Sequence, residues 1–391
     1  MSFSSNLLLM GVTMFQVLIC CSMLCAIGTN MAPEPMLAGP VQLTFPSEFH
    51  KAGESYFSDD GTRLIFQAVP AVAEGESPDE HYGMYVSEVI RDDANVVNAL
   101  HNTRRISPPD SANTCGWFYP GRRDRVLFAT TTTAPFEAKP PGYQRESGDY
   151  RWQFPPEMNI IAVDLDKADG TANDFEPLVS DDSAYLAEGS VSPDGRHLLY
   201  TSLATGDGDL WVKDLHSGDA RPIVEAPGYD GGPFFSPDGR RITYRSDRNL
   251  DDLLQVYVAD LEFSEAGSIL GIVDEHQITR NEHVNWCPFW TCDGRSLVYA
   301  TSQIGHHNYE IFIVDADAGG DGAPLRYGTG VQRVTIMPGF DGLPAFSSDG
   351  RSMVWTSKRS GAEGSQLWVS PFDQYGGADP AVGSPVIGDE H

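Results

Sequence analysis

The sequence predicts an all-β protein, a six-bladed β-propeller closed by an N-terminal strand that completes the last blade. Three observations support this prediction. A hairpin unit recurs along the chain, a third and a fourth strand follow most copies, and the last copy lacks the fourth strand that instead precedes the first copy. Four antiparallel strands repeated around one axis are the architecture of a propeller.

The repeated hairpin is marked by an Asp-Gly turn with an aromatic residue five positions after the glycine. The five pairs are Gly61 with Phe66, Gly195 with Tyr200, Gly239 with Tyr244, Gly294 with Tyr299 and Gly350 with Trp355. A sixth, degenerate copy is "FYPGRRDRVLFATT", in which Phe128 takes the aromatic place. In the Ser-Pro-Asp-Gly versions, proline presets φ and glycine takes the left-handed position that closes a bulged hairpin.

The remaining strands follow each hairpin in order. The third strands are "MYVSE", "IIAVD", "LWVKD", "VYVAD", "IFIVD" and "LWVS", and the fourth strands are "RRI", "EPLV", "RPIV", "HQIT" and "QRVT". The last copy has no fourth strand, but "VQLT" at 41–44 matches "HQIT" and "QRVT". We therefore expect 41–44 to complete the last blade, which removes the open sheet edges that invite aggregation.

The chain divides into four expected parts. Residues 1–28 are expected to be an export signal or an uncleaved anchor, because 7–27 are uncharged and mostly apolar. Residues 29–40 are expected to be a linker, 41–372 the propeller and 373–391 a flexible tail. The sequence thus predicts a periplasmic or extracellular monomer, inserted in a membrane only if the N-terminal segment is not cleaved.

The formal net charge of −29 limits the partners. A surface this acidic repels phosphate backbones, so we exclude nucleic acid as the main partner and favour cations, basic proteins or neutral polymers. Beyond residue 28 only three cysteines remain, Cys115, Cys287 and Cys292, and we expect buried thiols rather than a disulfide framework.

The copies "SPDGRHLLYTS", "FFSPDGRRITYRSDR" and "FSSDGRSMVWTSKRSG" resemble the WD-like repeat of the TolB family. The resemblance covers roughly 41–372 and implies an exported propeller that binds partner proteins of the cell envelope. Related propellers precede serine peptidase domains, but the chain has no Gly-x-Ser-x-Gly elbow. Other relatives are oligosaccharide lyases with His-rich metal sites.

Five polar residues at the start of first strands are expected to point toward the mouth of the central channel. They are Glu54, Glu188, Asp230, Asn285 and Asp341. One interpretation is an acidic ring that holds a cation or a basic peptide. The other is that these side chains cap the tight loops that lead into the strands.

Two further groups are expected on the same face. His283, His306 and His307, with Glu282 and Glu310, could bind a divalent cation, although their spacing matches no tight metal motif. No other cofactor is predicted. The long insertion 131–159 carries aromatic residues that are suited to anchor a partner or a sugar ring, namely Tyr143, Tyr150, Trp152 and Phe154. The same loop could instead pack on its own propeller as a lid.

The function favoured by the sequence is a non-catalytic scaffold that binds a protein or an envelope polymer. The alternative is a metal-assisted carbohydrate-active enzyme, an oligosaccharide lyase or hydrolase, with its metal near His283 and His306. No nucleophile–base pair can be argued from the sequence, because the carboxylates are dispersed along the chain.

Overall fold

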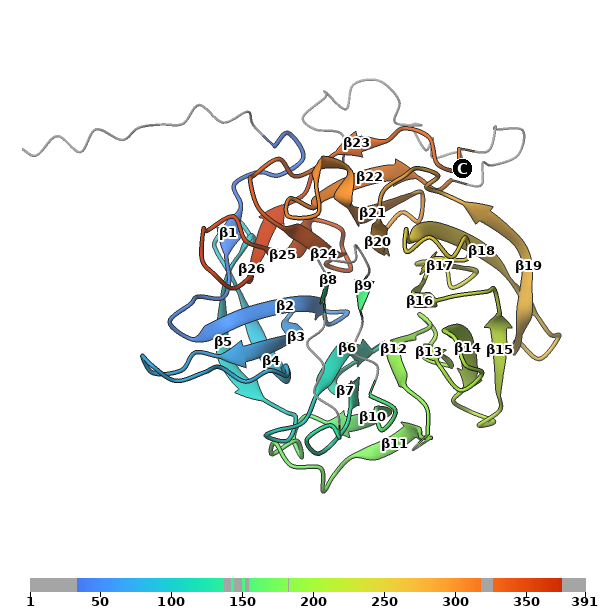
Figure 1. Cartoon of the computed structure of the whole chain (residues 1–391), viewed down its shortest axis with the longest axis horizontal. Helices are drawn as coiled ribbons and strands as arrows, with labels where there is room; N and C mark the ends of the chain where they lie inside the picture. The colour runs from blue at the N-terminus through green and yellow to red at the C-terminus, as the bar shows by residue number, and fades with distance from the viewer. Residues whose placement is uncertain are drawn as a thin grey trace, which may run out of the picture. The chain divides into compact units, whose positions relative to one another are not determined.

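The computed structural model describes residues 34–136, 155–181, 183–317 and 326–374, and the backbone of 142–143 and 150–151. It contains six four-stranded antiparallel sheets arranged around a central axis, as Figure 1 shows. The single helical segment of the described residues is the 3-10 turn η1 (Ser302–Ile304). The predicted six-bladed β-propeller is therefore confirmed.

Each blade is one sheet. From the axis outward its strands follow one another in chain order, except in blade 6, whose outermost strand comes from the N-terminal end of the chain. Blade 1 comprises β2 (Phe49–Phe57), β3 (Arg63–Pro70), β4 (Gly83–Arg91) and β5 (Val97–Arg105). Blade 2 comprises β6 (Asn113–Tyr119), β7 (Arg122–Thr130), β10 (Asn159–Asp164) and β11 (Glu176–Val179). Blade 3 comprises β12 (Leu186–Val191), β13 (His197–Ser202), β14 (Asp209–Asp214) and β15 (Ala220–Val224).

The other three blades repeat this order. Blade 4 comprises β16 (Asp230–Phe235), β17 (Arg241–Ser246), β18 (Gln255–Phe263) and β19 (Ile269–Gln277). Blade 5 comprises β20 (Asn285–Trp290), β21 (Ser296–Thr301), β22 (Glu310–Asp315) and β23 (Gln332–Arg333). Blade 6 comprises β24 (Asp341–Phe346), β25 (Ser352–Ser357), β26 (Gln366–Pro371) and the N-terminal β1 (Val41–Gln42).

The repeated hairpin turn is held by side-chain hydrogen bonds, as blade 3 illustrates. The Ser192 hydroxyl donates to the Asp194 carboxylate and accepts the His197 N–H, and the same carboxylate accepts the Arg196 N–H. Gly195 has φ +75°, a conformation that glycine adopts without steric cost. Blades 1, 4, 5 and 6 repeat the first of these bonds with Ser58 and Asp60, Ser236 and Asp238, Thr291 and Asp293, and Ser347 and Asp349.

The repeated aromatic residues form the core between blades. Phe66, Phe128, Tyr244 and Trp355 are completely buried, and Tyr200 and Tyr299 are nearly so. Burying a side chain of this size stabilises the fold by about 2–3 kcal/mol each, which explains why every blade keeps one. The repeat therefore encodes the turn and the packing that every blade needs.

The seam between the chain's two ends lies in blade 6. β1 pairs antiparallel with β26, with Val41 opposite Val369 and Gln42 opposite Trp368, where the sequence places the closing strand. Residues 34–40, expected to be a linker, also pack on this blade. Met36 and Leu37 are buried in an apolar cluster with Met353 and Trp355 of this blade. They therefore add to the contact that β1 makes with β26.

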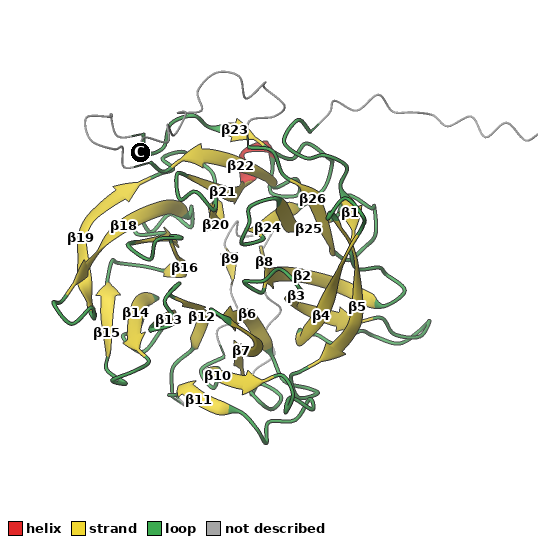
Figure 2. Ribbon diagram, turned by 180° about the vertical axis from the view of Figure 1, so that it is seen from behind, coloured by secondary structure: helices red, strands yellow, loops and turns green. Residues whose placement is uncertain are grey.

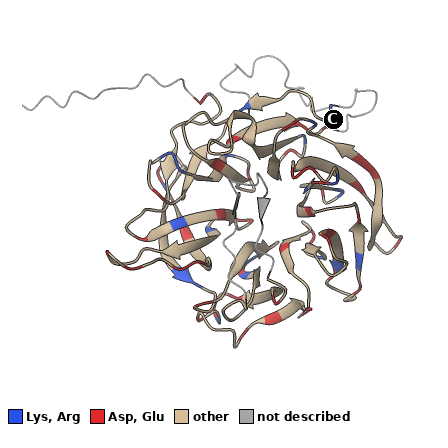
Figure 3. Cartoon of the chain, in the orientation of Figure 1, with Lys and Arg blue, Asp and Glu red and all other residues tan. Residues whose placement is uncertain are grey.

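Both ends of the chain extend beyond the described residues. The expected signal segment 1–28 lies outside them, as does most of the expected tail. Among the residues that are described, no helix has the length and apolar character needed to cross a bilayer. Figure 3 shows that Asp and Glu residues occur on sheets all around the ring, so the acidity is not confined to one blade.

Candidate functional site

The first strand of every blade carries a bulge at the same place. The residue in each bulge has a left-handed φ, between +41° and +60°: Glu54, Cys115, Glu188, Gly232, Cys287 and Leu343. The register with the second strand shifts there in all six sheets. Because a bulge re-aims the side chain at that position, these six residues, the bulge ring, line one cavity of about 630 Å³.

One layer further along the same strands, the axis of the propeller is filled. The residues two positions after the bulge ring are Tyr56, Trp117, Ser190, Phe234, Phe289 and Ala345. The Tyr56 ring lies 5.0 Å from that of Trp117 and 5.6 Å from that of Phe234. Blades 1 and 4 are opposite each other, so their rings can meet only across the axis. These aromatic rings form the floor that closes the cavity at one end.

Glu188 and Arg245 form an ion pair in the wall of the cavity. The Arg245 Nη2 lies 2.6 Å from Glu188 Oε1, and both side chains are about nine-tenths buried. The Tyr229 hydroxyl and the Gly232 N–H also donate to this carboxylate. A Cβ at position 232 would lie 2.0 Å from Arg245 Nη1, so the glycine makes room for the guanidinium. These contacts, together with a hydrogen bond from the Thr201 hydroxyl at 2.8 Å, fix the orientation of the Glu188 side chain.

Glu54 occupies a different environment on the other side of the cavity. It accepts hydrogen bonds from the Tyr56 hydroxyl at 3.3 Å and the Thr114 hydroxyl at 3.2 Å, both neutral groups. Burial raises the pKa of Glu54, and repulsion from the Glu188 carboxylate raises it further, although hydrogen bonds from Cys115 and Thr114 oppose these effects. Glu54 is therefore a carboxyl that a hydrogen-bonding or cationic ligand would stabilise.

The two cysteines of the bulge ring are protonated thiols. Burial raises the pKa of Cys115 well above its usual range, and repulsion from the nearby carboxylates of Glu54 and Glu188 makes a smaller contribution in the same direction. Burial raises the pKa of Cys287 to about 12. Since the thiolate is the reactive species, neither cysteine is suited to act as a nucleophile. The expectation that all three thiols are buried holds for Cys287 alone. Cys115 is half-buried, and Cys292 is exposed because it lies in the solvent-facing hairpin turn.

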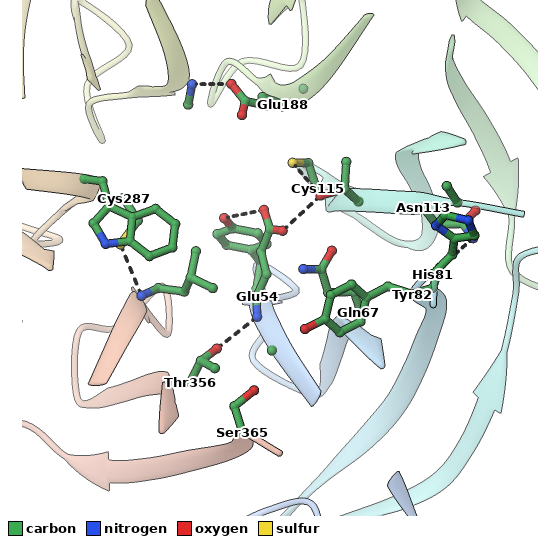
Figure 4. Close-up of a pocket in the computed structure, with 18 of the residues that line it drawn as sticks. Glu54, Gln67, His81, Tyr82, Asn113, Cys115, Glu188, Cys287, Thr356 and Ser365 are labelled. Carbon is green, nitrogen blue, oxygen red and sulfur yellow. Dashed lines mark hydrogen bonds between the residues drawn. The ribbon is translucent and has the colours of Figure 1, made fainter. Parts of the chain in front are cut away.

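Figure 4 shows how these groups lie around the cavity. Glu54, Cys115, Glu188 and Cys287 come from four different blades and face one common space. Gln67, His81, Tyr82 and Asn113 lie to the side of Glu54, and Thr356 bonds the Glu54 N–H at 3.0 Å. The wall thus combines carboxylates, hydroxyls, thiols and aromatic rings.

Of the five polar residues expected at the channel mouth, the structure brings two together. Glu54 and Glu188 line the cavity, whereas Asp230, Asn285 and Asp341 lie two residues earlier and are buried in their own blades. Residues two positions apart in a regular strand share one face, but the bulge breaks this alternation. These three side chains therefore point away from the cavity that the bulge ring lines.

The three buried residues bond to groups of their own or the adjacent blade, and of the three only Asp230 accepts a backbone N–H in the described part of the chain, as a loop cap would. Asp341 accepts from Trp355 Nε1 at 2.9 Å and pairs with Arg359 at 3.2 Å. Asp230 accepts the Ala226 N–H at 3.1 Å and pairs with Arg248 at 3.4 Å. The Asn285 amide donates to the carbonyl of His283 and the side chain of Gln255. Burial raises the pKa of Asp230 and of Asp341 to about 6.

The aromatic loop is described only in part. The side chains of Tyr143, Tyr150, Trp152 and Phe154 lie outside the described residues. The short strands β8 (Gly142–Tyr143) and β9 (Tyr150–Arg151) pair with each other, and Figures 1 and 2 both project them onto the centre of the ring. Pro155 and Met158, at the end of this insertion, line the cavity. The expectation of a binding loop over the channel stays a prediction.

The predicted histidines lie near one another on two loops. His306 and His307 are exposed and His283 is half-buried. Burial lowers the pKa of His306, and the neighbouring His307 and His283 lower it further. In the described part of the chain, one group of three side chains has its ligand atoms within 4.8 Å, and it consists of other residues: Asp260, Asp274 and His276. A metal held by the predicted histidines stays a prediction.

Sequence reasoning missed Cys115, Gly232, Cys287, Leu343 and the arginine Arg245 as parts of the site. A signal was available for three of them, because Gly232, Cys287 and Leu343 stand seven residues before their turn glycines, as Glu54 and Glu188 do. Applying this single offset to every blade would have found all of the bulge ring except Cys115, which precedes the degenerate turn.

Comparison with known proteins agrees with this architecture. Residues 162–323 match the family described as "TolB beta propeller domain". The Tol-Pal system protein TolB of Francisella tularensis is 26% identical over 99 residues, which are 22% of this chain and 23% of that protein. The uncharacterized peptidase YuxL of Bacillus subtilis is 23% identical over 217 residues, covering 48% of this chain and 31% of that protein.

A solved structure assigned as TolB, from Agrobacterium tumefaciens, superposes with a TM-score of 0.50 at 17% identity, covering 82% of this chain and 90% of that one. At this identity the likeness shows the fold alone. The sequence matches, by contrast, cover less than a third of those relatives' length. The repeat, the family match over 162–323 and the six-bladed architecture together show a β-propeller that is similar to the propeller domain of TolB proteins.

Proposed function

We propose that this propeller is a non-catalytic binding protein that accepts part of a protein or envelope polymer in its central cavity. The observation that carries the proposal is the bulge ring. The fold aims one residue from each blade into a closed-ended cavity, and those residues differ from blade to blade. A cavity of about 630 Å³ lies within the range that encloses a small ligand or one or two side chains of a partner.

The chemistry of the cavity supports a polar ligand that carries donors. Glu188 is an oriented carboxylate, Glu54 lacks a charged partner among its hydrogen bonds in the described residues, and Trp286 and Phe340 supply apolar surface. The net charge of −29 favours approach of a basic or neutral partner. The relatives named for the Tol-Pal system make a partner in the cell envelope, and a periplasmic or extracellular location, part of this proposal.

A second candidate is a carbohydrate-active hydrolase or lyase, and one observation favours it. Glu54 and Glu188 face the same cavity in different environments: burial raises the pKa of Glu54, while Glu188 pairs with Arg245 and accepts a hydrogen bond from Tyr229. Acid–base cleavage of a glycosidic bond uses two carboxyl groups that are placed in different environments.

The test fills the cavity without touching the repeat. Leu343→Trp places a large side chain in the bulge ring, and Val331→Trp is the matched control because Val331 is 50% exposed and does not line the cavity. We expect purified wild-type protein and Val331→Trp to capture the same partner from an envelope extract. Leu343→Trp should bind this partner at least about tenfold more weakly, which is a loss of about 1.4 kcal/mol in binding free energy.

Equal recovery of the partner by Leu343→Trp, with unchanged circular dichroism, would refute binding in the cavity. The enzyme candidate is judged on the same proteins. Turnover of an oligosaccharide panel by the wild type, abolished in Glu54→Gln, would replace the scaffold proposal.

A further inference from the structure

The third strands of four blades carry an aspartate as their sixth residue, and one of these aspartates is unlike the rest. Three of these aspartates pair with an arginine: Asp164 with Arg125 at 3.0 Å, Asp214 with Arg196 at 2.8 Å, and Asp315 with Arg326 at 2.6 Å. The fourth, Asp260 of blade 4, has His276 as its ionic partner within the described part of the chain. The repeat therefore leaves one of these carboxylates without its arginine.

An arginine lies within reach of Asp260 in the sheet, but its guanidinium bonds to other groups. Arg241 lies directly opposite Asp260 in the β17–β18 ladder. Its guanidinium donates instead to the backbone carbonyls of Ala316 at 2.7 Å and Gly294 at 2.6 Å and lies over the Trp290 ring. These contacts join blades 4 and 5, so Arg241 is held away from Asp260.

A second carboxylate and an imidazole take the place of the arginine. Asp274 of β19 lies directly opposite Asp260, and His276 follows two residues later on the same face of the strand. Like charges placed directly opposite each other across two strands are destabilising unless a cation lies between them. His276 Nε2 is 3.5 Å from Asp274 Oδ2 and 3.8 Å from Asp260 Oδ2.

We propose that Asp260, Asp274 and His276 bind a divalent transition metal ion, with zinc as the representative ion. Two ligand atoms each ~2.1 Å from a tetrahedral zinc ion are about 3.4 Å apart. The three ligand atoms lie within 4.8 Å of one another, so their separations need to shrink by at most about 1.4 Å to reach one ion. One imidazole with two carboxylates suits zinc and its first-row neighbours better than magnesium.

Local contacts orient the ligands and leave the site open. The His276 ring stacks on Tyr327 at 4.1 Å, and Asp274 Oδ1 accepts the Glu275 N–H, which leaves Oδ2 for the metal. The Asp274 side chain is 66% exposed, so an ion enters from solvent and water completes its coordination. None of the three ligands lines the central cavity, and the metal site therefore stands independently of the proposed function.

Calorimetric titration of the EDTA-treated full chain with zinc chloride tests the proposal, at about pH 7.5 where histidine is neutral. We expect one equivalent of zinc to bind tightly. His276→Phe keeps the stacking on Tyr327 and removes the ligand nitrogen, and it should weaken this binding by about tenfold or more. Asp260→Asn and Asp274→Asn should weaken it to a similar extent.

His101→Phe, at an exposed histidine outside every candidate metal site, is the matched control and should titrate like the wild type. Thermal unfolding in EDTA should be the same for wild type and His276→Phe, which separates loss of the metal from loss of the fold. Unchanged zinc binding by His276→Phe, or no zinc binding by the folded wild type, would overturn the site. In the second case His276 would only pair with the two aspartates.

Discussion

Two positions in the first strand of each blade, only two residues apart, have opposite roles. At the earlier position, Asp230 and Asp341 are fully buried and bonded to arginines of their own blades. At the later position, the bulge turns Glu54 and Glu188 into the central cavity. The similarity of Asp230 and Asp341 between blades reflects a shared structural need, whereas the variety of the bulge ring gives the cavity its particular chemistry.

Blades 4 and 6 build the same arrangement of charges around the earlier position. In blade 4, Arg248 lies between Asp230 and Glu275, and Glu275 comes from the blade's own fourth strand. In blade 6, Arg359 lies between Asp341 and Glu34, and Glu34 comes from the N-terminal segment. The same carboxylate–arginine–carboxylate arrangement is thus built from two different sources, and in blade 6 it fastens the ends of the chain together.

The largest effect is expected from removing the shared cation of blade 6. Arg359→Met leaves Glu34 and Asp341 buried without their charge partner, and the Arg359 side chain is only 4% exposed. We expect a loss of about 3–5 kcal/mol in the free energy of unfolding, measured with urea. Arg359→Lys should lose less, because the charge stays. Partner binding per folded molecule should not change, and a parallel loss of binding would place this arginine in the site rather than the scaffold.

A smaller effect distinguishes the two sources of the second carboxylate. Glu34→Gln should lower the free energy of unfolding by about 2 kcal/mol, because it weakens a bidentate pair with Arg359 that is almost fully buried. Glu275→Gln, in the more solvent-exposed pair with Arg248, should cost about 1 kcal/mol. Urea unfolding of both variants checks the order. A greater loss from Glu275→Gln would show that the N-terminal segment does not fasten the ring.

The fold could be predicted because its determinants are local and repeated. Each blade needs the same turn, and Asp194 with Gly195 illustrates the hydrogen bonds and the left-handed backbone that the sequence signals. The seam was equally visible, since the missing strand of blade 6 had its match at 41–44. Burial of one aromatic residue in each blade follows from the same periodicity.

The site was only half predictable, because its residues are defined by the bulge rather than by their chemical type. Asp230 and Asp341 attracted attention as acidic repeats, yet their arginine partners stand eighteen residues later and became apparent only in three dimensions. Gly232 contributes by lacking a side chain, which admits Arg245. No signal in the sequence separates Tyr56 and Phe234 from ordinary core aromatics, and their contact across the axis identifies the floor of the cavity.

The smallest predicted effect concerns the pH dependence of stability at the bulge ring. Burial raises the pKa of Glu54 above its ordinary value of 4.5, so the folded protein holds this proton more tightly than the unfolded chain does. Below pH 4.5 both states are protonated and Glu54 affects stability little. As the pH rises through the raised pKa, the wild type must ionise a buried carboxyl and loses stability.

Glu54→Gln removes this penalty, so its stability relative to the wild type should increase between acid and neutral pH, measured by urea unfolding at each pH. Glu48→Gln, at an exposed carboxyl, should show no such trend. A constant difference between Glu54→Gln and the wild type would mean that Glu54 is already ionised and paired in the folded protein. The cavity would then hold two carboxylates of one kind, which removes the distinction between Glu54 and Glu188 on which the hydrolase candidate depends.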